Sequence, residues 1–557
     1  MRSKPQRFEL SRRAALIGAA SSVANIPAAS ISQPFTNLRE FASGRVFEDQ
    51  RGDGQRYPGD RGVAGVLISN GCDVVATDDD GRWYLQVGHG DHVFVVKPAH
   101  WSTSPAPGRA PGFAYLHQPL GSPHALQFAG VAPTAALPRE IDFPLRRNPE
   151  DRNYNVALVA DTQPSNLTEL GYLQRTLIAP LVQEKVAFAI NHGDVVGDDL
   201  SLFGDYVDLI GTTGIAWHHC PGNHDMNLDS PDGAHAFETW KRVFGPPHYA
   251  FQAGDATFII LNTVEYAGYP RPASDKPAYR GWVGPRQLAF VKNLLRHVPA
   301  RHLIVVSMHI PLASYEDPGS VADTTGDMPE LLKLLSGRNH SVSFSGHLHT
   351  TEHHYFGEEF GFSKSRLHHH QVLTAACGSW WSGPLDRDGI PVSDSRDGSP
   401  KGFHILSIDG YQYETKFVAA AREQMRVLIT TPDAIGSGSA ACGRILSSPI
   451  AKSAAASAQI VVDVFDGGPH TRVFAAIDDW PLPVPELTRC LMPDPYIVEA
   501  FADPTIVRPS WLRASPSSHM WFGSLPALLS LGRHRLTIRA VGEFGREHVT
   551  QTHIAIA

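Results

Sequence analysis

The sequence predicts an α/β domain flanked by two all-β sandwich domains, and three patterns lead to this prediction. From residue 150 to about 415, short apolar segments alternate with amphipathic stretches, as in βαβ crossovers. Residues 41–148 alternate apolar and polar positions, as in GVLISNGCDVVATDDDGRWYLQV, with Asn-Gly and Asp-Gly turns. Residues 420–557 return to strand patterns such as QIVVDVF and HRLTIRAV.

The first 30 residues predict an export signal. The pair Arg12-Arg13 precedes a short apolar run, Leu16 to Ala29, and small residues follow in IPAAS. The run is too short and too interrupted to span a bilayer, which favours a cleaved twin-arginine signal. A disordered basic tail is the alternative. The signal predicts a periplasmic or secreted protein with no transmembrane segment after cleavage.

The composition limits the classes of partner that the protein is expected to bind. Of the 557 residues, 42% are hydrophobic and 19% charged, as in a soluble protein with several cores. The formal charge is −8, and loss of residues 1–30, with five basic residues and one acidic residue, would make it −12. This argues against a nucleic acid polymer or an anionic membrane as the main partner. The five cysteines form no CxxC pair, although the formation of one or two disulfides after export remains an alternative.

The first β domain, 41–148, resembles the small prealbumin-like sandwiches that precede many secreted enzymes. In the α/β domain, 150–415, two helical stretches are Leu170–Gln183 and Pro285–Arg296. The predicted strand segments are 156–161, 186–194, 214–225, 256–263, 302–309 and 341–349. The last domain, 420–557, is predicted to be a second β sandwich.

Five of these six strand segments end in residues that bind metal ions. The endings are Asp161, Gly193-Asp194, Gly222-Asn223-His224-Asp225, His309 and Gly346-His347-Leu348-His349. In open α/β sheets the functional site lies beyond the carboxyl ends of the strands, so these residues should meet at one edge. Carboxylates, an amide and imidazoles make a plausible set for two metal ions, with one aspartate shared. The glycines allow tight turns beside an ion.

This order of motifs, D-x-[H/Q]…GD…GNH[DE]…H…GHxH, resembles the calcineurin-like metallophosphoesterases over residues 150 to about 415. The resemblance implies a four-layer αββα sandwich. The flanking stretches GHLHTTEHHY and GSWWSGPLDRDGIPVSDSRDGSPKGF look like an exported bacterial branch with β domains on both sides of the α/β domain.

The resemblance also implies roles for the residues of the site. The first ion would be held by Asp161, Gln163, Asp194 and His349. The second would be held by Asp194, Asn223, His309 and His347. A hydroxide between the ions would attack phosphorus in line, and the ions would neutralise charge on the phosphoryl oxygens. His224 would donate a proton to the leaving oxygen, with Asp225 orienting its ring.

Position 163 departs from the commonest family pattern, because most members have histidine there. An amide oxygen still binds a hard cation, so the first site would favour Mn²⁺, with Fe²⁺ or Mg²⁺ next, over Zn²⁺. The alternative is that Gln163 only hydrogen-bonds Asp161 and leaves the first site partly empty.

Other aromatic and histidine residues carry weaker predictions. His353 and His354 are expected to support the site, His192 to be packed, and one of His218 and His219 to lie near the site. The run His368-His369-His370 is expected at a solvated edge. Trp380 and Trp381 could wall the pocket and stack on a base, sugar or lipid head group, or could pack between domains.

The leading prediction is therefore an exported metal-dependent phosphoesterase acting on a small phosphate mono- or diester. A nucleotide, a sugar phosphate, a glycerophosphodiester or a lipid head group would fit. The alternative is a catalytically weak envelope-binding protein whose β domains bind and whose metal site is structural. The His224-Asp225 pair favours the enzyme, because a structural metal site has no use for a histidine outside its ligands.

Overall fold

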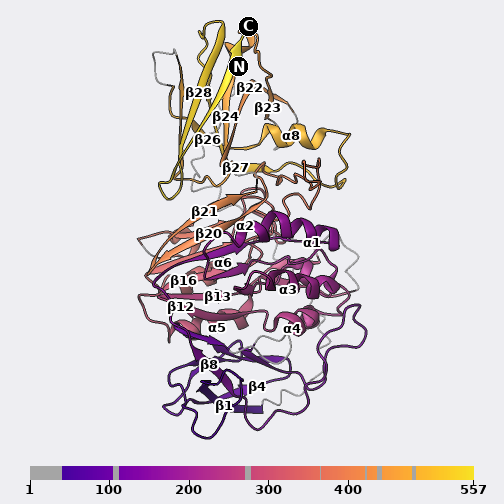
Figure 1. The fold of residues 1–557 in the computed structure, drawn as a ribbon, viewed down its shortest axis with the longest axis vertical. Helices are drawn as coiled ribbons and strands as arrows, with labels where there is room; N and C mark the ends of the chain where they lie inside the picture. The colour runs from indigo at the N-terminus through magenta and orange to yellow at the C-terminus, as the bar shows by residue number, and fades with distance from the viewer. Residues whose placement is uncertain are drawn as a thin grey trace.

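The computed structural model describes residues 40–103, 112–269, 278–363, 365–420, 423–435, 442–478 and 484–557. The predicted export signal, residues 1–30, lies outside this part of the chain. Three domains follow one another along the long axis of the molecule (Figure 1), with the N-terminal β domain at the bottom and the C-terminal β domain at the top.

The central domain is built on two mixed β-sheets. The first contains, in spatial order, β11 (Ala216–His219), β10 (Phe188–Asn191), β9 (Asn153–Val159), β20 (Gly402–Asp409) and β21 (Gln412–Ala419). The second contains β12 (Tyr249–Ala253), β13 (Ala256–Ile260), β16 (Leu303–Ser307), β17 (His340–Ser345), β19 (His368–Val372) and β18 (Glu352–Phe356). Because β21 runs to Ala419, this domain extends past the predicted end at 415.

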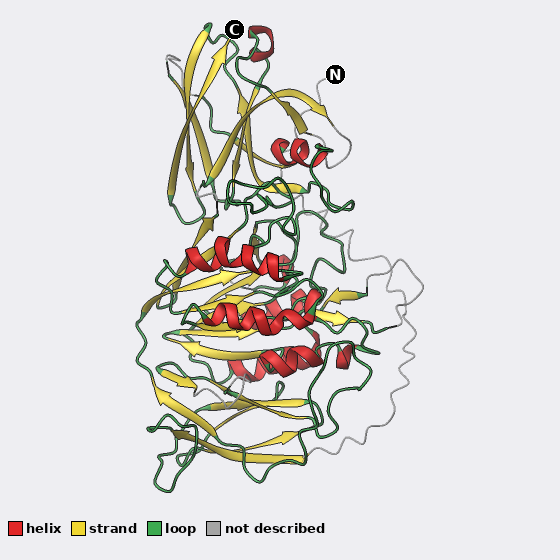
Figure 2. Ribbon diagram, turned by 45° about the vertical axis from the view of Figure 1, so that its right-hand side comes forward, coloured by secondary structure: helices red, strands yellow, loops and turns green. Residues whose placement is uncertain are grey.

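Helices cover the outer face of each sheet. The first sheet is covered by α1 (Leu167–Leu173), η1 (Gln174–Ile178), α2 (Ala179–Leu181), α3 (Phe203–Gly211) and α4 (Glu238–Phe244), and the second by α5 (Gly284–Leu295) and α6 (Met328–Leu335). Short 3₁₀ turns η2 (Leu200–Leu202), η3 (Asn223–Asp225), η4 (Gly233–His235) and η5 (Glu358–Phe360), and the hairpin β14 (Val264–Tyr266) and β15 (Tyr279–Gly281), complete the domain. Figure 2 shows these helices beside the stacked strands. The predicted four-layer αββα arrangement is confirmed.

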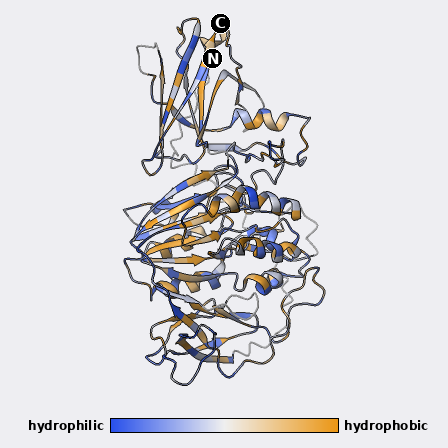
Figure 3. Ribbon diagram, in the orientation of Figure 1, coloured by the Kyte–Doolittle hydropathy of each residue, from blue (hydrophilic) through white to orange (hydrophobic). Residues whose placement is uncertain are grey.

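The burial of β9 explains why its sequence is apolar on both faces. Val156, Leu158 and Ala160 pack in the core between the two sheets, whereas Ala157 and Val159 pack against the helices of the first sheet. All five side chains are buried, and the strands of this domain are largely hydrophobic in Figure 3. A central strand covered on both sides needs an unbroken apolar run.

Strand direction brings the predicted motifs to one edge of each sheet. In the first sheet β9, β10 and β11 are parallel, and Asn191 pairs with both Val159 and His219. In the second sheet β13, β16 and β17 are parallel, and Ser307 pairs with both Ile260 and Phe344. The loops that follow these strands therefore leave from the same end, as the sequence predicts.

The run His368-His369-His370 is not a solvated edge, so that prediction is wrong. It forms β19, between β17 and β18, and all three residues are buried. Ser343 Oγ lies 2.8 Å from His368 Nε2 and 2.7 Å from His370 Nδ1. The serines that alternate with apolar residues in SVSFS thus satisfy the imidazoles inside the sheet, which is why histidines can be buried there.

The N-terminal domain is a β sandwich that also contributes to the central core. Its sheets contain β4 (Arg82–Val87), β1 (Glu40–Glu48), β8 (Phe143–Arg147) and β6 (Trp101–Thr103), and β3 (Val74–Ala76), β2 (Leu67–Ser69), β5 (Asp91–Val96) and β7 (Ala114–His117). On β5, Val93 and Val95 face the inside of the sandwich, while Phe94 and Val96 join the core of the central domain. Phe94 meets Phe290 of α5 edge-on, with ring centroids 5.7 Å apart. One strand therefore joins two cores.

The C-terminal domain is the second predicted sandwich. Its sheets contain β23 (Cys442–Ile445), β22 (Met425–Ile435), β24 (Gln459–Val464), β27 (Pro516–Ser524) and β26 (Thr488–Pro493), and β25 (Arg472–Ile477), β28 (Gly532–Val541) and β29 (Glu547–Ile556). Two short helices, α7 (Lys452–Ala455) and α8 (Pro495–Ala502), accompany them. Residues of both sheets, such as Val462 and Ile538, share one core.

Asp466 of the C-terminal domain anchors it to the central domain. Its Oδ1 lies 3.2 Å from His353 Nε2 and 3.2 Å from His404 Nε2, and it accepts the Gln371 amide at 3.0 Å. All three partners are buried. Burial alone would raise the pKa of Asp466, but the two histidines lower it below its usual range. His353 therefore supports the domain interface.

A second buried link between the two domains involves His519 on β27. Its Nε2 lies 2.8 Å from Asp397 Oδ2 and its Nδ1 2.5 Å from Asp463 Oδ1. Asp397 precedes β20 and also accepts the backbone N–H of Thr351, at 2.6 Å. Burial opposes charging of His519, but the two carboxylates raise its pKa to about 10.

Two further features bear on the sequence predictions. No disulfide joins any of the five cysteines, all of which lie in the described part of the chain. Within that same part, no helix is both long enough and apolar enough to cross a bilayer.

We predict that Asp466→Ala destabilises the protein by roughly 2–4 kcal/mol, because it leaves three buried polar side chains at the interface without the carboxylate that they share. Thermal and urea unfolding would measure the change. The matched control is Asp478→Ala, which removes an exposed pair with Arg535 in the same domain and should cost under about 1 kcal/mol. Equal effects of the two substitutions would contradict this role for Asp466.

We also predict a pH dependence carried by His519. Its pKa is higher in the folded protein, about 10, than the ordinary value of an exposed histidine, about 6.5, so its contribution to stability is complete below about pH 6.5. The contribution is lost as the pH rises towards 10. The gap in unfolding free energy between wild type and His519→Asn should therefore narrow over this range. His553→Asn, at an exposed position on β29, is the control, and a gap that stays constant would refute the assignment.

Candidate metal centre

The backbone at the motif residues has an unusual conformation. Asp161, Gln163, Asp194, His347 and His349 all have positive φ, between 36° and 79°. Non-glycine residues rarely adopt such angles, and they persist where the surrounding structure compels them, often at functional sites. Each strand thus ends in a sharp turn that directs its side chain to the shared edge.

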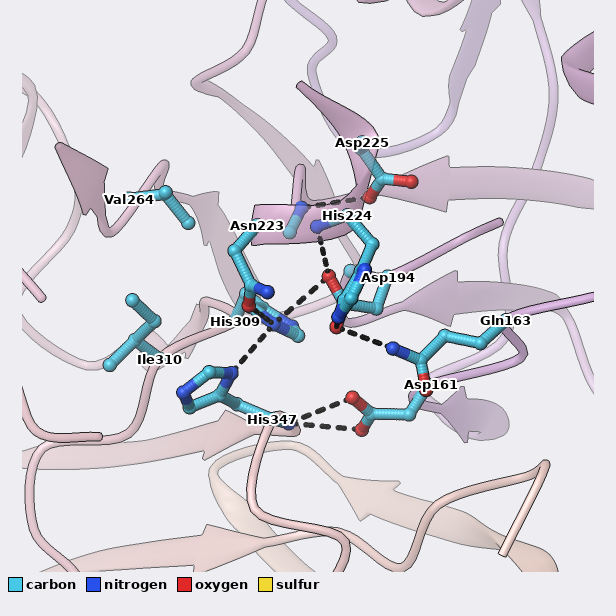
Figure 4. A network of polar contacts seen from close by, with 12 residues as sticks. Asp161, Gln163, Asp194, Asn223, His224, Asp225, Val264, His309, Ile310 and His347 are labelled. Atoms are coloured by element: carbon cyan, nitrogen blue, oxygen red, sulfur yellow. Dashed lines mark hydrogen bonds and ion pairs between the residues drawn. The ribbon is translucent and has the colours of Figure 1, made fainter. Parts of the chain in front are cut away.

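Four side-chain atoms meet at this edge (Figure 4). His309 Nε2 lies 3.0 Å from Asn223 Oδ1, 3.2 Å from Asp194 Oδ1 and 3.2 Å from His347 Nδ1. The ligand atoms of Asp194, His309 and His347 all lie within 4.8 Å of one another. The four residues come from the loops after β10, β11, β16 and β17.

The protons of this cluster point away from its centre. His309 Nδ1 lies 2.8 Å from the backbone carbonyl of His192, which can only accept, so Nδ1 carries a proton and a neutral ring would present the lone pair of Nε2 to the cluster. Nε2 of His347 lies 3.3 Å from Asp323 Oδ1, and Nδ1 is the ring nitrogen that faces His309. Lone pairs that face one another without a proton repel, and a cation between them removes this repulsion. This donor set fits a divalent metal ion.

A second group of donors lies beside the first. His349 Nε2 is 3.7 Å from Asp161 Oδ1, and its Nδ1 is 2.5 Å from the carbonyl of Gly378, so here too the lone pair faces a carboxylate. Both Asp161 oxygens accept the backbone N–H of His347, at 3.0 Å. Burial and the charge of Asp194 raise the pKa of the Asp161 carboxyl well above its usual range. Two buried carboxylates so close together favour a cation.

Gln163 lies at this second group, with its amide turned towards Asp194. Nε2 donates to Asp194 Oδ2 at 2.9 Å, and Oε1 accepts from the Cys377 thiol at 3.4 Å. Gln163 therefore hydrogen-bonds Asp194, not Asp161 as the alternative prediction had it. An amide rotated by 180° would bring its oxygen to the metal side, so the same side chain can serve as a ligand.

Close packing explains two of the predicted glycines. A Cβ at Gly222 would lie 2.2 Å from the backbone nitrogen of Asp194, and one at Gly346 would lie 2.4 Å from Asp161 Oδ2. Any side chain at these positions would displace a carboxylate of the cluster.

His224 is oriented by Asp198 and not by Asp225, which corrects the sequence prediction. Asp198 Oδ1 lies 2.7 Å from His224 Nδ1. Asp225 is buried and instead accepts backbone N–H groups from Gly222 at 2.8 Å and Val195 at 2.9 Å, so it shapes the loop. Burial alone would lower the pKa of His224, but the carboxylates of Asp194 and Asp198 raise it to about 9. No signal in the sequence indicated the role of Asp198 in orienting His224, because Asp198 lies four residues after Asp194 and outside the Gly193-Asp194 motif.

The cluster forms the floor of a cavity of about 300 Å³. Residues that the sequence analysis did not single out line the rest of it: Tyr279, Ser314, Glu316, Asp317, Asp323 and Arg396. Trp380 is also in the wall and stacks on His349, with ring centroids 3.8 Å apart, while Trp511 of the C-terminal domain meets its ring edge-on. Trp380 thus both lines the cavity and packs between the central and C-terminal domains. It combines the two roles that the sequence analysis gave as alternatives.

The remaining predicted residues lie away from the cavity. Trp381 is buried and donates its indole N–H to the carbonyl of Thr162. His192 is packed, as predicted, and His354 pairs with Glu352 at 2.7 Å. His218 stacks on Phe251, so neither it nor His219, which packs against Phe244, reaches the cavity.

Comparison with protein families identifies three matching regions. The model described as calcineurin-like phosphoesterase matches residues 154–351. Those described as the N terminal and the C terminal of calcineurin-like phosphoesterase match residues 50–131 and 370–548. The three matches follow one another in the order of the three domains.

Comparison with solved structures finds a purple acid phosphatase, PPD1, from yellow lupin (Lupinus luteus) seeds. It is 13% identical, with a TM-score of 0.36, and the match covers 69% of this chain and 72% of that chain. The comparison with curated proteins gave no match.

We predict different effects of removing the two neighbouring aspartates. Asp225→Ala should destabilise the protein by roughly 2–4 kcal/mol, because it leaves buried backbone N–H groups without an acceptor. Asp198→Ala, at a half-exposed position, should cost under about 1 kcal/mol but lower the pKa of His224 by about one unit in the metal-free protein. Chemical unfolding and an NMR titration of labelled histidine would test this. An unchanged pKa of His224 in Asp198→Ala would contradict the pairing of His224 with Asp198.

Proposed function

The chain belongs to the calcineurin-like phosphoesterases, metal-dependent hydrolases of phosphoric esters, and on that premise we propose that it hydrolyses a small phosphate mono- or diester with two divalent ions outside the cytoplasm. The convergence of four lone-pair atoms from Asp194, Asn223, His309 and His347 carries this proposal. It describes one ion-binding position. Asp161 and His349 would add the second, with Asp194 shared and Gln163 as its fourth ligand.

The ions would supply Lewis acidity towards the phosphoryl oxygens and lower the pKa of a water molecule. The protein's own residues hold and move protons around them. His224 lines the cavity and is about one-third exposed, with Nδ1 on Asp198. A ring held in this way presents Nε2 to the cavity, where it would donate a proton to the leaving oxygen. Asp198 is a positioning residue, since it acts through His224.

The mixture of ligands supports manganese. An oxygen from Gln163 in place of an imidazole would leave the position with Asp161, Asp194 and His349 with three oxygen donors and one nitrogen donor. Harder cations prefer such a set, so Mn²⁺ is favoured, with Fe²⁺ or Mg²⁺ next and Zn²⁺ last.

The proposed location rests on the sequence, and the proposed substrate range rests on the size of the cavity. The twin arginine Arg12-Arg13 and the apolar run after it support export by the twin-arginine route to the periplasm or beyond. The cavity of about 300 Å³ is the size of a site for a small molecule, which supports a nucleotide, a sugar phosphate, a glycerophosphodiester or a lipid head group as the substrate.

The experiment is hydrolysis of 4-nitrophenyl phosphate and bis(4-nitrophenyl) phosphate by metal-stripped protein. Each would be measured after addition of Mn²⁺, Fe²⁺, Zn²⁺ or Mg²⁺. We expect activity that returns with metal, highest with Mn²⁺, because Gln163 offers oxygen where a relative would offer nitrogen. The preferred ester would separate a monoesterase from a diesterase.

Asn223→Ala removes one of the four converging atoms and should lower kcat/KM by at least about 100-fold, with a matching loss of Mn²⁺ affinity in calorimetry. Asn293→Ala, on α5 away from the cavity, is the control. A protein that stays inactive with every metal would reject the proposal and favour the envelope-binding alternative.

A further inference from the structure

The part of the cavity wall beside the metal-binding residues has features that no phosphate group would select. We propose that this wall recognises a cationic group on the substrate, and that the enzyme hydrolyses phosphate esters of an amino alcohol or a quaternary-ammonium alcohol. This inference rests on the proposed function, since it concerns the group attached to the phosphate that the metal centre would attack.

Carboxylates dominate this wall. Glu316, Asp317 and Asp323 all line the cavity. Asp323 is about 40% exposed; its Oδ1 lies 3.3 Å from His347 Nε2, and its Oδ2 accepts the Ser320 hydroxyl at 2.5 Å. Asp317 is exposed and accepts only the backbone N–H of Gly319, at 3.2 Å, among its described side-chain partners. Neither carboxylate forms an ion pair with a lysine or arginine among the described residues.

The positive charge nearby is already engaged. Arg396 is the one arginine or lysine among the described residues that line the cavity. Its guanidinium pairs with Glu316 and also donates from Nε to the backbone carbonyl of Arg513, at 3.3 Å. His224, the other basic group outside the metal cluster, pairs with Asp198. An anionic substituent would compete with Glu316 for Arg396 and would be repelled by Asp317 and Asp323.

Aromatic rings complete the surface. Trp380 lines the cavity, and its position is held by His349 below and by Trp511 of the C-terminal domain beside it. Tyr279 lines it from β15, with its ring against His347, centroids 6.1 Å apart. Carboxylates beside aromatic faces are the surroundings that bind ammonium groups, through charge and cation–π attraction together.

Both kinds of residue line one cavity. Asp194 and His347 of the metal cluster line it together with Asp317 and Trp380. A molecule with a phosphate at one end and an ammonium group a few bonds away would place each charge against its complement. The acidic wall is thus part of the site already described, and it selects the group that surrounds the phosphate.

The test compares two substrates of equal shape. One is 4-nitrophenyl phosphocholine, and the other is 4-nitrophenyl 3,3-dimethylbutyl phosphate, in which carbon replaces the quaternary nitrogen. Phosphocholine and 3,3-dimethylbutyl phosphate give the same comparison for a monoesterase. With Mn²⁺-loaded full-length protein we expect kcat/KM to favour the cationic ester by about 10-fold or more. Added salt should reduce the preference, because part of the wall is exposed.

Asp317→Asn keeps the size of the side chain and removes its charge. The preference should then fall by about 3- to 10-fold, mainly through KM for the cationic ester, with a smaller change in kcat/KM for the uncharged ester. Asp323→Asn is a second variant on the same wall. Equal rates for the two esters in the wild type, or a preference for the uncharged one, would overturn the inference and leave the proposed function standing. If neither these esters nor 4-nitrophenyl phosphate are hydrolysed, the proposed function itself fails.

Discussion

The constraint on which this structure depends is the meeting of unprotonated donor atoms in a buried place. His309 Nε2 lies 3.2 Å from both Asp194 Oδ1 and His347 Nδ1, and a cation between these atoms would stabilise the arrangement. The rest of the central domain holds it in place. Parallel strands end in register, the turns after them take up positive φ, and glycines at 222 and 346 leave room for the carboxylates. These strained turns therefore serve to hold the cluster in place.

Much of this could be predicted from the sequence. The apolar run before Asp161 predicts a strand covered on both faces, and the repeated placement of Asp, Asn and His at strand ends predicts that they meet. Side-chain pairing could not be predicted in the same way. Asp225 follows His224 directly, yet its carboxylate turns into the loop, and Asp198, from another strand end, reaches the ring. The polar run His368-His369-His370 gives no sign of burial, because the partners of His368 and His370 are serines on a neighbouring strand about 25 residues earlier in the chain.

The flanking β domains are more than appendages of the central one. Phe94 from the N-terminal sandwich packs into the central core, and Asp466 from the C-terminal sandwich joins the buried His353 of the second central sheet and the buried His404 of the first. Trp511 reaches further, because it supports the ring of Trp380 beside the metal centre. Through Trp380 the C-terminal domain takes part in the shape of the cavity, so changes in its loops could alter which esters fit without any change in the metal-binding residues.

The pairing of β9 with β20 has a consequence for biosynthesis. β9 ends at Val159, and its antiparallel neighbour begins only at Gly402, so one side of this strand has no partner until the ribosome has made most of the protein. Asp466 comes later still. Such distant contacts slow folding and leave apolar strand edges open in the growing chain. A nascent chain of this kind needs protection from aggregation until its last third emerges, and a fragment that stops before β21 would lack an edge of its own central sheet.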